Sequence, residues 1–204
     1  MITVVDYGMG NLRSVQKALH RVGYEAEVSS NPDRLSRSRL LVVPGVGAFD
    51  QAVRNLKTKN IWRPVSNHLH AGKPYLGICL GLQLLFEGSQ EGSRTGFGFF
   101  RGEVISFQKV RVVPHMGWNN VRWRGRAEEF MPPLDDPCYY FVHSYFPVPE
   151  NKTIVAGTAD YGGEFCAAVR AGNCFGIQFH PEKSQYAGLS LLKNYCRYIF
   201  EERN

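Results

Sequence analysis

The chain has 204 residues, of which 44% are hydrophobic and 21% charged, with a formal net charge of +6. A chain of this length buries enough surface to fold without a disulfide or a metal, which favours a single domain over residues 1–204. The opening segment Met1–Asp6 is too short for a signal peptide and no apolar run is long enough for a membrane span, so we expect a cytoplasmic protein.

The positive charge and the cysteines exclude several further classes. Arginines cluster at residues 34–39 and 122–126, but no helix-turn-helix, RRM or zinc-finger pattern accompanies them, so nucleic-acid binding is not expected. The five cysteines are odd in number and form no CxxC pair, which argues against a disulfide framework and a zinc site. Gly8-Met9-Gly10 lacks the third glycine of a dinucleotide fingerprint, because Arg13 stands there. The sequence therefore predicts neither a metal nor a cofactor.

The first half of the chain alternates strand and helix patterns. Buried strands are predicted at Ile2–Asp6, Tyr24–Val28, Leu40–Val43 and Pro74–Ile78, and helices at Asn11–Val22, Asp50–His70 and Leu80–Phe86. Wholly apolar strands separated by helices indicate a parallel sheet covered by helices on both faces.

The second half has a different texture. Short aromatic and β-branched runs between Gly98 and Phe179 predict strands at Tyr139–Val142, Thr153–Ala156 and Cys174–Phe179, with a hairpin turn at residues 170–173. The last segment, Tyr186–Phe200, returns to a helical pattern. We therefore predict one α/β domain whose second half differs in texture from the first.

Cys79 is the strongest candidate nucleophile. It stands between Gly77 and Gly81, where an apolar strand meets a predicted helix, which is the form of a nucleophile elbow. Glycine on both sides leaves room for strand and helix to approach, and a helix N-terminus favours the thiolate. A lone cysteine is most often a buried core residue, and that interpretation holds for Cys138, Cys166, Cys174 and Cys196.

His180 and Glu182 are the candidate base and its orienting acid. Residues two apart in an extended segment point to the same side, so both side chains are expected on one face. A carboxylate beside an imidazole sets its tautomer and stabilises the imidazolium. Alone, His-Pro-Glu is typical of a turn that ends a strand; together with the cysteine elbow it predicts a Cys-His-Glu triad.

Two further features lie near this predicted site. Pro44–Phe49 is a glycine-rich turn at the end of a strand, able to direct backbone N–H groups at an oxyanion. Gln83 lies one helical turn after Cys79 and can share its face, although spacing alone equally allows a polar surface residue.

Three segments, PGVGAF at 44–49, GICLGLQLL at 77–85 and FHPEKS at 179–184, resemble the class I, triad-type glutamine amidotransferases. DYGMGNLRSV at 6–15, PHMGWNNV at 114–121 and YFVHSYF at 140–146 resemble one branch of that family, the glutaminase subunits of imidazole glycerol phosphate synthases. The resemblance covers essentially the whole chain. It implies a twisted, mostly parallel central sheet with flanking helices and an added antiparallel portion, and it implies glutamine hydrolysis through a thioester on Cys79.

The resemblance also implies roles for residues outside the triad. Gly47 and Leu80 would supply oxyanion N–H groups, and Gly45, Gln83, Ser144 and Tyr145 would hold glutamine. The implied partner is a (β/α)8 cyclase that receives the ammonia and makes imidazole glycerol phosphate and AICAR in histidine biosynthesis. The residues expected to face that partner are Asn11, Met116, Trp118, Asn119 and Lys183.

Three alternatives stay open at this stage. A paralogue feeding a cyclase-like synthase in another pathway, such as amidino-sugar synthesis, would carry nearly the same motifs. A stand-alone cysteine hydrolase is disfavoured by Gln83 and the HSY segment at 143–145. A regulatory subunit without catalysis is disfavoured by the intact triad.

Overall fold

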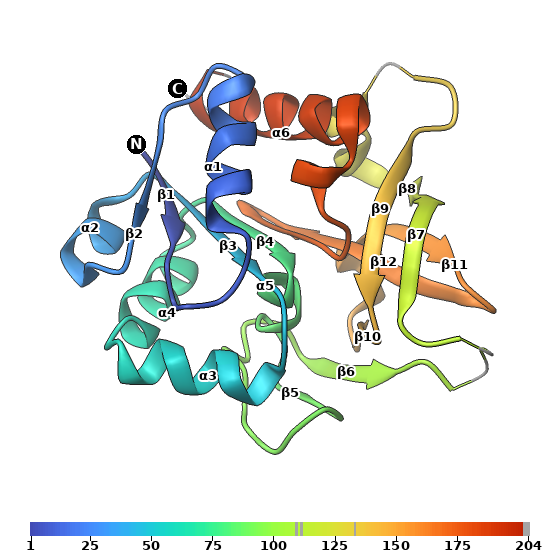
Figure 1. The fold of residues 1–204 in the computed structure, drawn as a ribbon, viewed down its shortest axis with the longest axis horizontal. Helices are drawn as coiled ribbons and strands as arrows, with labels where there is room; N and C mark the ends of the chain where they lie inside the picture. Colours follow the sequence, from blue (N-terminus) through green and yellow to red (C-terminus); the bar gives the residue numbers. More distant parts are fainter. Residues whose placement is uncertain (109, 111, 133, 202–204) are drawn as a thin grey trace.

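An eight-stranded sheet forms the centre of the protein in a computed structural model that describes residues 1–108, 110, 112–132 and 134–201 (Figure 1). The strand order is β2-β1-β3-β4-β13-β12-β11-β8. The first five strands run parallel, and the last three join by antiparallel pairing. In sheet order the bounds are Ala26–Ser29, Ile2–Val5, Leu40–Gly45, Tyr75–Cys79, Cys174–Ile177, Glu164–Ala171, Val155–Asp160 and Arg122–Trp123.

Helices bury both faces of the parallel half. Successive residues of a strand point to opposite faces, so Leu40 and Val42 of β3 join one core cluster and Leu41 and Val43 join the other. Helices α1 (Leu12–Arg21) and α6 (Gln185–Phe200) cover the first face, and α3 (Phe49–Thr58) and α4 (Trp62–His70) cover the second (Figure 1). The predicted α/β class, with its mostly parallel sheet, is confirmed.

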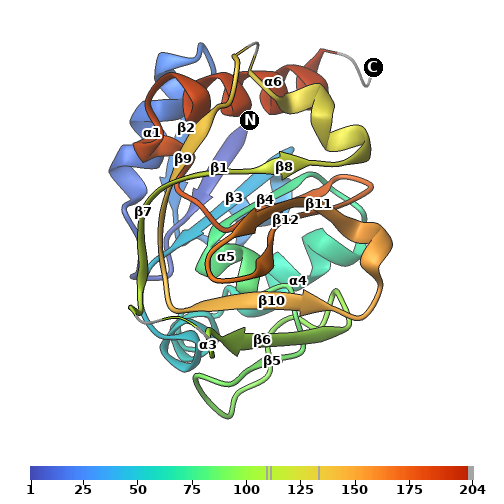
Figure 2. The same cartoon turned by 90° about the vertical axis from the view of Figure 1, so that its right-hand side faces the viewer.

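The added antiparallel portion lies at one end of this sheet (Figure 2). A three-stranded sheet has the order β10-β6-β5, with bounds Tyr145–Pro149, Gly102–Ser106 and Gly88–Ser89. A two-stranded ribbon pairs β7 (His115–Asn120) with β9 (Cys138–His143). Three 3-10 turns, η1 (Gly125–Phe130), η2 (Lys152–Ile154) and η3 (Pro181–Lys183), complete the connections.

Two of the predicted helices were wrong in extent. The predicted helix Asp50–His70 is two helices, because Asn60 takes a left-handed φ of 59° between them and turns the chain. The predicted helix Leu80–Phe86 is the four-residue α5 (Leu80–Gln83), followed by a tight turn. A helix this short has little macrodipole, so the expected support for a thiolate reduces to the N–H groups of its first turn.

Two strand predictions also need correction. Residues 153–156 are divided between η2 and β11 because the Asn151 side chain accepts from the Thr153 N–H and nucleates a turn there. The second strand begins at Ala26 and not at Tyr24. The short helix α2 (Pro32–Arg37), capped by the Asn31 side chain, was not predicted. In the described part of the chain, no helix combines the length and the apolar character needed to cross a bilayer.

Candidate active site

Cys79 lies at a strained turn at the carboxyl end of the central strand β4. It has φ 54° and ψ −106°, a region that non-glycine residues rarely adopt, and it is the last residue before α5. This conformation rotates the side chain away from the sheet, and 5% of the residue is exposed. The structure thus has the sharp strand-to-helix elbow that the sequence predicts.

The flanking glycines are required by close backbone contacts. A Cβ on Gly77 would lie 2.5 Å from the Gly81 carbonyl oxygen, and a Cβ on Gly81 would overlap the Val43 carbonyl oxygen. The first contact sets α5 against its own strand, and the second sets it against β3. Glycine at both positions therefore lets the elbow close, as the sequence interpretation supposed.

His180 and Glu182 form a buried ion pair beside this elbow. His180 Nδ1 lies 2.9 Å from Glu182 Oε1, and the two side chains are 3% and 1% exposed. His180 is extended, but Glu182 belongs to the 3-10 turn η3, so the expectation that both lie on one face of an extended segment was wrong. The turn η3 brings the Glu182 carboxylate into contact with the His180 imidazole, so the predicted pairing forms through a turn and not through an extended segment.

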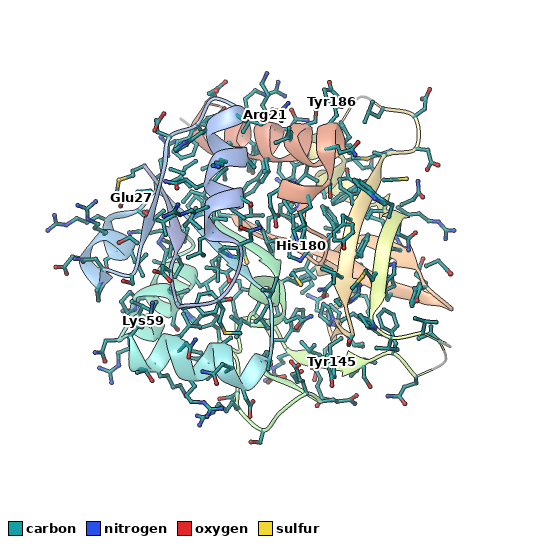
Figure 3. All side chains as sticks on the ribbon, viewed as in Figure 1. Arg21, Glu27, Lys59, Tyr145, His180 and Tyr186 are labelled. Carbon is teal, nitrogen blue, oxygen red and sulfur yellow. The ribbon has the colours of Figure 1, made fainter. Side chains whose placement is uncertain are left out.

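The pair has a distinctive electrostatic state. Burial lowers the pKa of His180, but the interactions with Cys79 and Glu182 outweigh it and raise the pKa to about 10. The Nδ1–H donates to the carboxylate, while Nε2 is buried and has no hydrogen-bond partner of ordinary geometry among the described residues. Because Nδ1 is committed to Glu182, the interaction with Cys79 falls to Nε2, which is available for proton transfer. Figure 3 shows His180 at the centre of the molecule, between the main sheet and the β7–β9 ribbon.

A cleft of about 340 Å³ opens onto Cys79. Its lining includes the turn after β3, the first helical turn after Cys79 and the segment that joins β9 to β10; the residues are Val46, Gly47, Ala48, Cys79, Leu80, Gln83, Glu91, Pro114, Val142, His143, Ser144 and Tyr145. Five residues predicted to act on substrate, Gly47, Leu80, Gln83, Ser144 and Tyr145, thus meet around one nucleophile although they come from three distant parts of the chain.

Gly45 and Gly47 behave differently at that cleft. Gly45 is buried and pairs with Cys79 in the β3–β4 register. A Cβ at Gly45 would overlap the Tyr7 hydroxyl, so this residue packs beneath the cleft and does not line it. Gly47 has a φ of 103° and follows Val46, which is 41% exposed. Leu80 is the first residue of α5, so its N–H has no acceptor within the helix.

The residues expected to face a partner lie on the surface around the β7–β9 ribbon, apart from Asn11. Met116 is 62% and Trp118 49% exposed, which is unusual for side chains of their size. The Trp118 ring lies 6.0 Å from that of Tyr140, and Lys183 Nζ lies 5.6 Å from the centre of the same Tyr140 ring. Asn119 is half-buried, and Asn11 is exposed at the start of α1.

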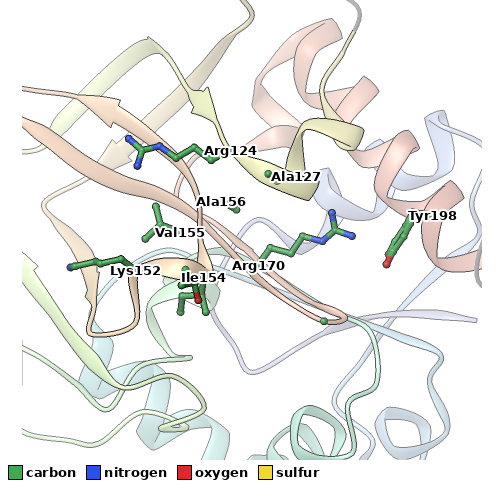
Figure 4. Close-up of a pocket in the computed structure, with 11 residues that line it drawn as sticks. Arg124, Ala127, Lys152, Ile154, Val155, Ala156, Arg170 and Tyr198 are labelled. Carbon is green, nitrogen blue, oxygen red and sulfur yellow. The ribbon is translucent and has the colours of Figure 1, made fainter.

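A second cavity, of about 460 Å³, is a poor candidate for chemistry (Figure 4). It is lined by Arg124, Lys152 and Arg170, and by Tyr198 of α6. Arg124 pairs with Glu164, and Arg170 packs on the Phe130 and Tyr198 rings and pairs with Glu129. Figure 4 shows the two guanidinium groups pointing away from each other. The cavity therefore offers neither a nucleophile nor a convergent set of cations.

Sequence reasoning did not single out three polar residues around the site. Gln178 is fully buried, and its Nε2 lies 3.5 Å from Cys79 Sγ. His143 and His115 are buried beside the cleft, with His115 Nδ1 3.1 Å from His143 Nε2. One signal was present for Gln178: it is the only polar residue in the run 174–179 that leads to His180. The two histidines are 28 residues apart, and only the pairing of β7 with β9 brings them together.

Comparisons with known proteins agree with this arrangement. The family model described as glutamine amidotransferase class-I matches residues 3–197. The chain is 48% identical over 199 residues to the imidazole glycerol phosphate synthase subunit HisH of Rhodopirellula baltica, covering 96% of this chain and 97% of that protein. It is also 48% identical over 197 residues to the subunit of the same name from Aquifex aeolicus, covering 95% of each chain.

Solved structures share the fold at low sequence identity. The structure of PurLQS from Thermotoga maritima superposes with a TM-score of 0.76 at 20% identity, covering 97% of this chain and 98% of the other. A crystal structure of a glutamine amidotransferase superposes with a TM-score of 0.73 at 20% identity, covering 98% of each. These likenesses support the architecture of the sheet and helices around the elbow.

Proposed function

The chain belongs to the class I glutamine amidotransferase family, and from that premise we propose that it is the glutaminase subunit of an imidazole glycerol phosphate synthase in histidine biosynthesis. One observation carries the chemistry: Cys79 stands on a strained elbow in a cleft and interacts with the buried His180–Glu182 pair. The subunit's role rests on relatives 44–48% identical over nearly the whole chain. The whole chain, residues 1–204, acts as one glutaminase domain.

The first half of the reaction forms a thioester. The Cys79 sulfur attacks the carboxamide carbon of glutamine, and the carbonyl π electrons move onto oxygen. The N–H groups of Gly47 and Leu80 receive the oxyanion, since both residues line the cleft at the sulfur. His180 Nε2 then gives its proton to the departing nitrogen, the C–N bond breaks, and ammonia leaves. Glu182 holds the imidazole and stabilises its protonated form throughout.

The second half releases glutamate. His180, now neutral, takes a proton from water, and the hydroxide attacks the thioester carbon. The C–S bond breaks, which restores the Cys79 thiolate, and glutamate leaves with the oxygen from water in its new carboxyl group. Each cycle consumes one glutamine and one water and restores the protonation states of Cys79 and His180.

The cleft suits a small amino acid with two charged ends. Glu91 is a carboxylate in the lining, and its Oε2 is held 2.8 Å from the backbone nitrogen of Phe49, so it is placed to pair with an α-ammonium group. Ser144 and Tyr145 contribute a hydroxyl and backbone amides on the other wall. Gln83 is oriented toward the Tyr145 carbonyl, which supports that wall.

The partner is a (β/α)8 cyclase bound over the β7–β9 ribbon, in the cytoplasm. Exposed Met116 and Trp118 are apolar side chains of the kind that fill the centre of a protein interface. Asn119, Lys183 and Asn11 extend the proposed contact with polar groups. A sealed interface has a chemical purpose, since ammonia released into neutral water becomes ammonium, which is not a nucleophile.

The test is glutamine hydrolysis by the purified chain, alone and with the histidine-pathway cyclase and its nucleotide ligand. We expect weak activity alone, a rise of at least about tenfold in the complex, and none in Cys79→Ala, since removing the nucleophile removes the covalent route. Strong hydrolysis without a partner would support the triad and reject the proposal that the activity depends on the partner.

The same assay addresses the paralogue. No stimulation by this cyclase, with stimulation by a cyclase-like synthase of another pathway, would assign the chain to amidino-sugar synthesis or a similar route. Trp118→Ala and Met116→Ala are expected to weaken the complex while leaving the basal hydrolysis of the free chain unchanged.

A further inference from the structure

Two buried glutamine side chains connect the wall of the cleft to the nucleophile. Gln83 Nε2 donates to the Tyr145 carbonyl oxygen at 3.0 Å and to Gln178 Oε1 at 3.2 Å. Gln178 Nε2 in turn lies 3.5 Å from Cys79 Sγ, an ordinary length for a hydrogen bond to sulfur. Gln83 is 5% exposed and Gln178 0%, so water does not compete for these groups.

The orientation of both amides follows from the contacts themselves. A backbone carbonyl only accepts hydrogen bonds, so the Gln83 atom facing the Tyr145 oxygen must be its nitrogen. That same nitrogen faces Gln178, whose facing atom must therefore be the oxygen. The remaining atom of the Gln178 amide, which faces Cys79, is then the N–H donor. Rotating either amide by 180° would set two donors or two acceptors against each other.

We propose that Gln178 is a further catalytic residue, which donates an amide N–H to the Cys79 sulfur and stabilises the thiolate that attacks the substrate. This role rests on the proposed glutaminase function. A hydrogen bond to a charged acceptor in a dry interior is stronger than one to a neutral acceptor. Gln178 therefore supplies the support that the four-residue helix α5 is too short to give through its dipole.

The backbone position of Gln178 favours this assignment. Its own N–H donates to the Ala167 carbonyl at 2.8 Å, which ties the residue to β12 just beyond the end of β13. Two residues later comes His180, so a single short segment carries both groups that act on the sulfur. The Tyr145 carbonyl, at the far end of the amide pair, also receives the Nδ1–H of His143 at 2.9 Å. The donor aimed at Cys79 is thus held by contacts on two sides.

The experiment measures alkylation of Cys79 by iodoacetamide in the full chain, without glutamine or partner, as a function of pH. Mass spectrometry of the Cys79 peptide separates it from the other four cysteines. Gln178→Met keeps the volume and removes the donor, and Gln178→Glu replaces the donor with an acceptor. At neutral pH we expect alkylation about tenfold slower in Gln178→Met, the size of one hydrogen bond to a charged group, and slower again in Gln178→Glu. In both, the pH–rate profile moves to higher pH and the plateau rate is retained.

Two further variants make the result decisive. Gln83→Met leaves Gln178 in place but removes the group that orients it, so a smaller slowing of about threefold is expected. Thr158→Val is a matched control, because Thr158 is also a buried polar residue but bonds Glu164, and its profile is expected to equal that of the wild type. Thermal unfolding checks that each variant is folded. If the Gln178 variants are not folded, the alkylation profile of Gln83→Met tests the proposal in their place.

The inference would be overturned if the alkylation profiles of the Gln178 variants coincided with that of the wild type. If only the Gln83→Met variant folds, an unchanged profile of that variant would overturn it. The proposed function fails separately, because it requires Cys79-dependent hydrolysis of glutamine by the wild type, whereas alkylation requires no substrate. A shifted alkylation profile without glutaminase activity would therefore reject the function and keep the amide–sulfur contact. In an active enzyme, kcat is expected to fall in Gln178→Met with KM little changed.

Discussion

The protein has two buried histidine sites, and they differ in their neighbours more than in their burial. His180 is 2% exposed, and His143 and His115 are 5% and 3% exposed. His180 pairs with Glu182, whereas His143 Nε2 faces His115 Nδ1 at 3.1 Å and has no carboxylate in contact among the described residues. The pKa of His180 is raised to about 10, while burial lowers that of His143 to about 3 and that of His115 to about 4.

The direction of the hydrogen bond between His115 and His143 is fixed, because His143 also bonds a backbone carbonyl, which can only accept. His143 Nδ1 must carry the proton that it shares with the Tyr145 oxygen, so in the neutral ring Nε2 accepts from His115 Nδ1–H. His115 Nε2 is then an acceptor toward Asn119 Nδ2 at 3.4 Å. His115 stacks on Phe141 and Tyr161, and its burial among these apolar groups favours the uncharged ring.

The comparison teaches that burial alone does not make a histidine reactive. His180 has one nitrogen committed to a carboxylate and the other unbonded, the combination that proton transfer needs. His143 has both nitrogens bonded to protein groups, so it can hold a wall of the cleft but cannot exchange protons with substrate.

The largest effect is expected from removing the reactive histidine. His180→Ala should lower glutaminase kcat in the active complex on the order of 10²- to 10⁴-fold, the range for loss of a general acid–base group. The variant is expected to be less stable, because the change leaves a cavity and a buried unpaired carboxylate, so thermal unfolding must confirm that it is folded. Steady-state kinetics measures the effect, and a loss below about fivefold, smaller than any such group supplies, would contradict the role assigned to His180.

A smaller loss is expected from neutralising the carboxylate that distinguishes the two sites. Glu182→Gln keeps the shape and an acceptor for Nδ1–H but removes the charge that raises the pKa of His180. We expect kcat to fall about ten- to hundredfold, the value of a charged hydrogen bond. The alkaline limb of the pH–rate profile should also move to lower pH than in the wild type. An alkaline limb that does not move would be evidence against the pairing of His180 with Glu182.

The pH dependence of stability should have opposite signs at the two sites. The raised pKa of His180 gives stability that is complete below pH 6.5 and is lost as the pH rises toward about 10. The lowered pKa values of His143 and His115 give stability that is complete above pH 6.5. It is lost as the pH falls toward about 4 for His115 and about 3 for His143, by about 1.4 kcal/mol per pH unit for each group.

Urea unfolding measures the free energy of unfolding at a series of pH values. The difference between each variant and the wild type gives the contribution of the histidines that the variant removes. The double variant His115→Phe/His143→Phe should flatten the acid limb, and His180→Ala should flatten the alkaline limb. Differences are needed because buried His68, whose pKa is lowered to about 4, adds to the acid limb in every variant. An acid limb that keeps its full slope in the double variant would contradict the neutral state assigned to the pair.

The smallest effect is expected from His143 alone. In His143→Phe the new ring fits the aromatic cluster of Phe107, Phe141 and Phe165, and Gln83 still holds the Tyr145 carbonyl. We expect KM for glutamine to rise about fivefold with kcat retained, and stability to fall by about 1–3 kcal/mol because His115 loses its acceptor. Adding His115→Phe should recover part of that stability; further destabilisation instead would mean that the histidines act independently.

Local sequence patterns were sufficient for the elements that their own residues specify. The apolar strands Ile2–Val5 and Leu40–Gly45, the elbow at Cys79 and the helix at the carboxyl end each follow from composition, spacing and glycine placement within a few residues. The proposed triad could be put forward from the sequence because each of its parts is marked locally, Cys79 by its glycines and His180 by the adjacent proline and acid. The helix break at Asn60 and the turn at Lys152–Ile154 could not, because single polar residues decide them.

By itself, the sequence determined the family and the α/β class and singled out the three residues of the proposed triad, because these depend on contacts between near neighbours and on matched motifs. Only the tertiary structure decided which way the Gln178 amide points, that His143 is neutral and bonded on both sides, and that Glu182 reaches His180 through a turn. The physical reason is distance along the chain. Gln178 is oriented by Gln83, 95 residues away, and His143 by His115, 28 residues away, so their hydrogen bonds exist only after the strands have paired.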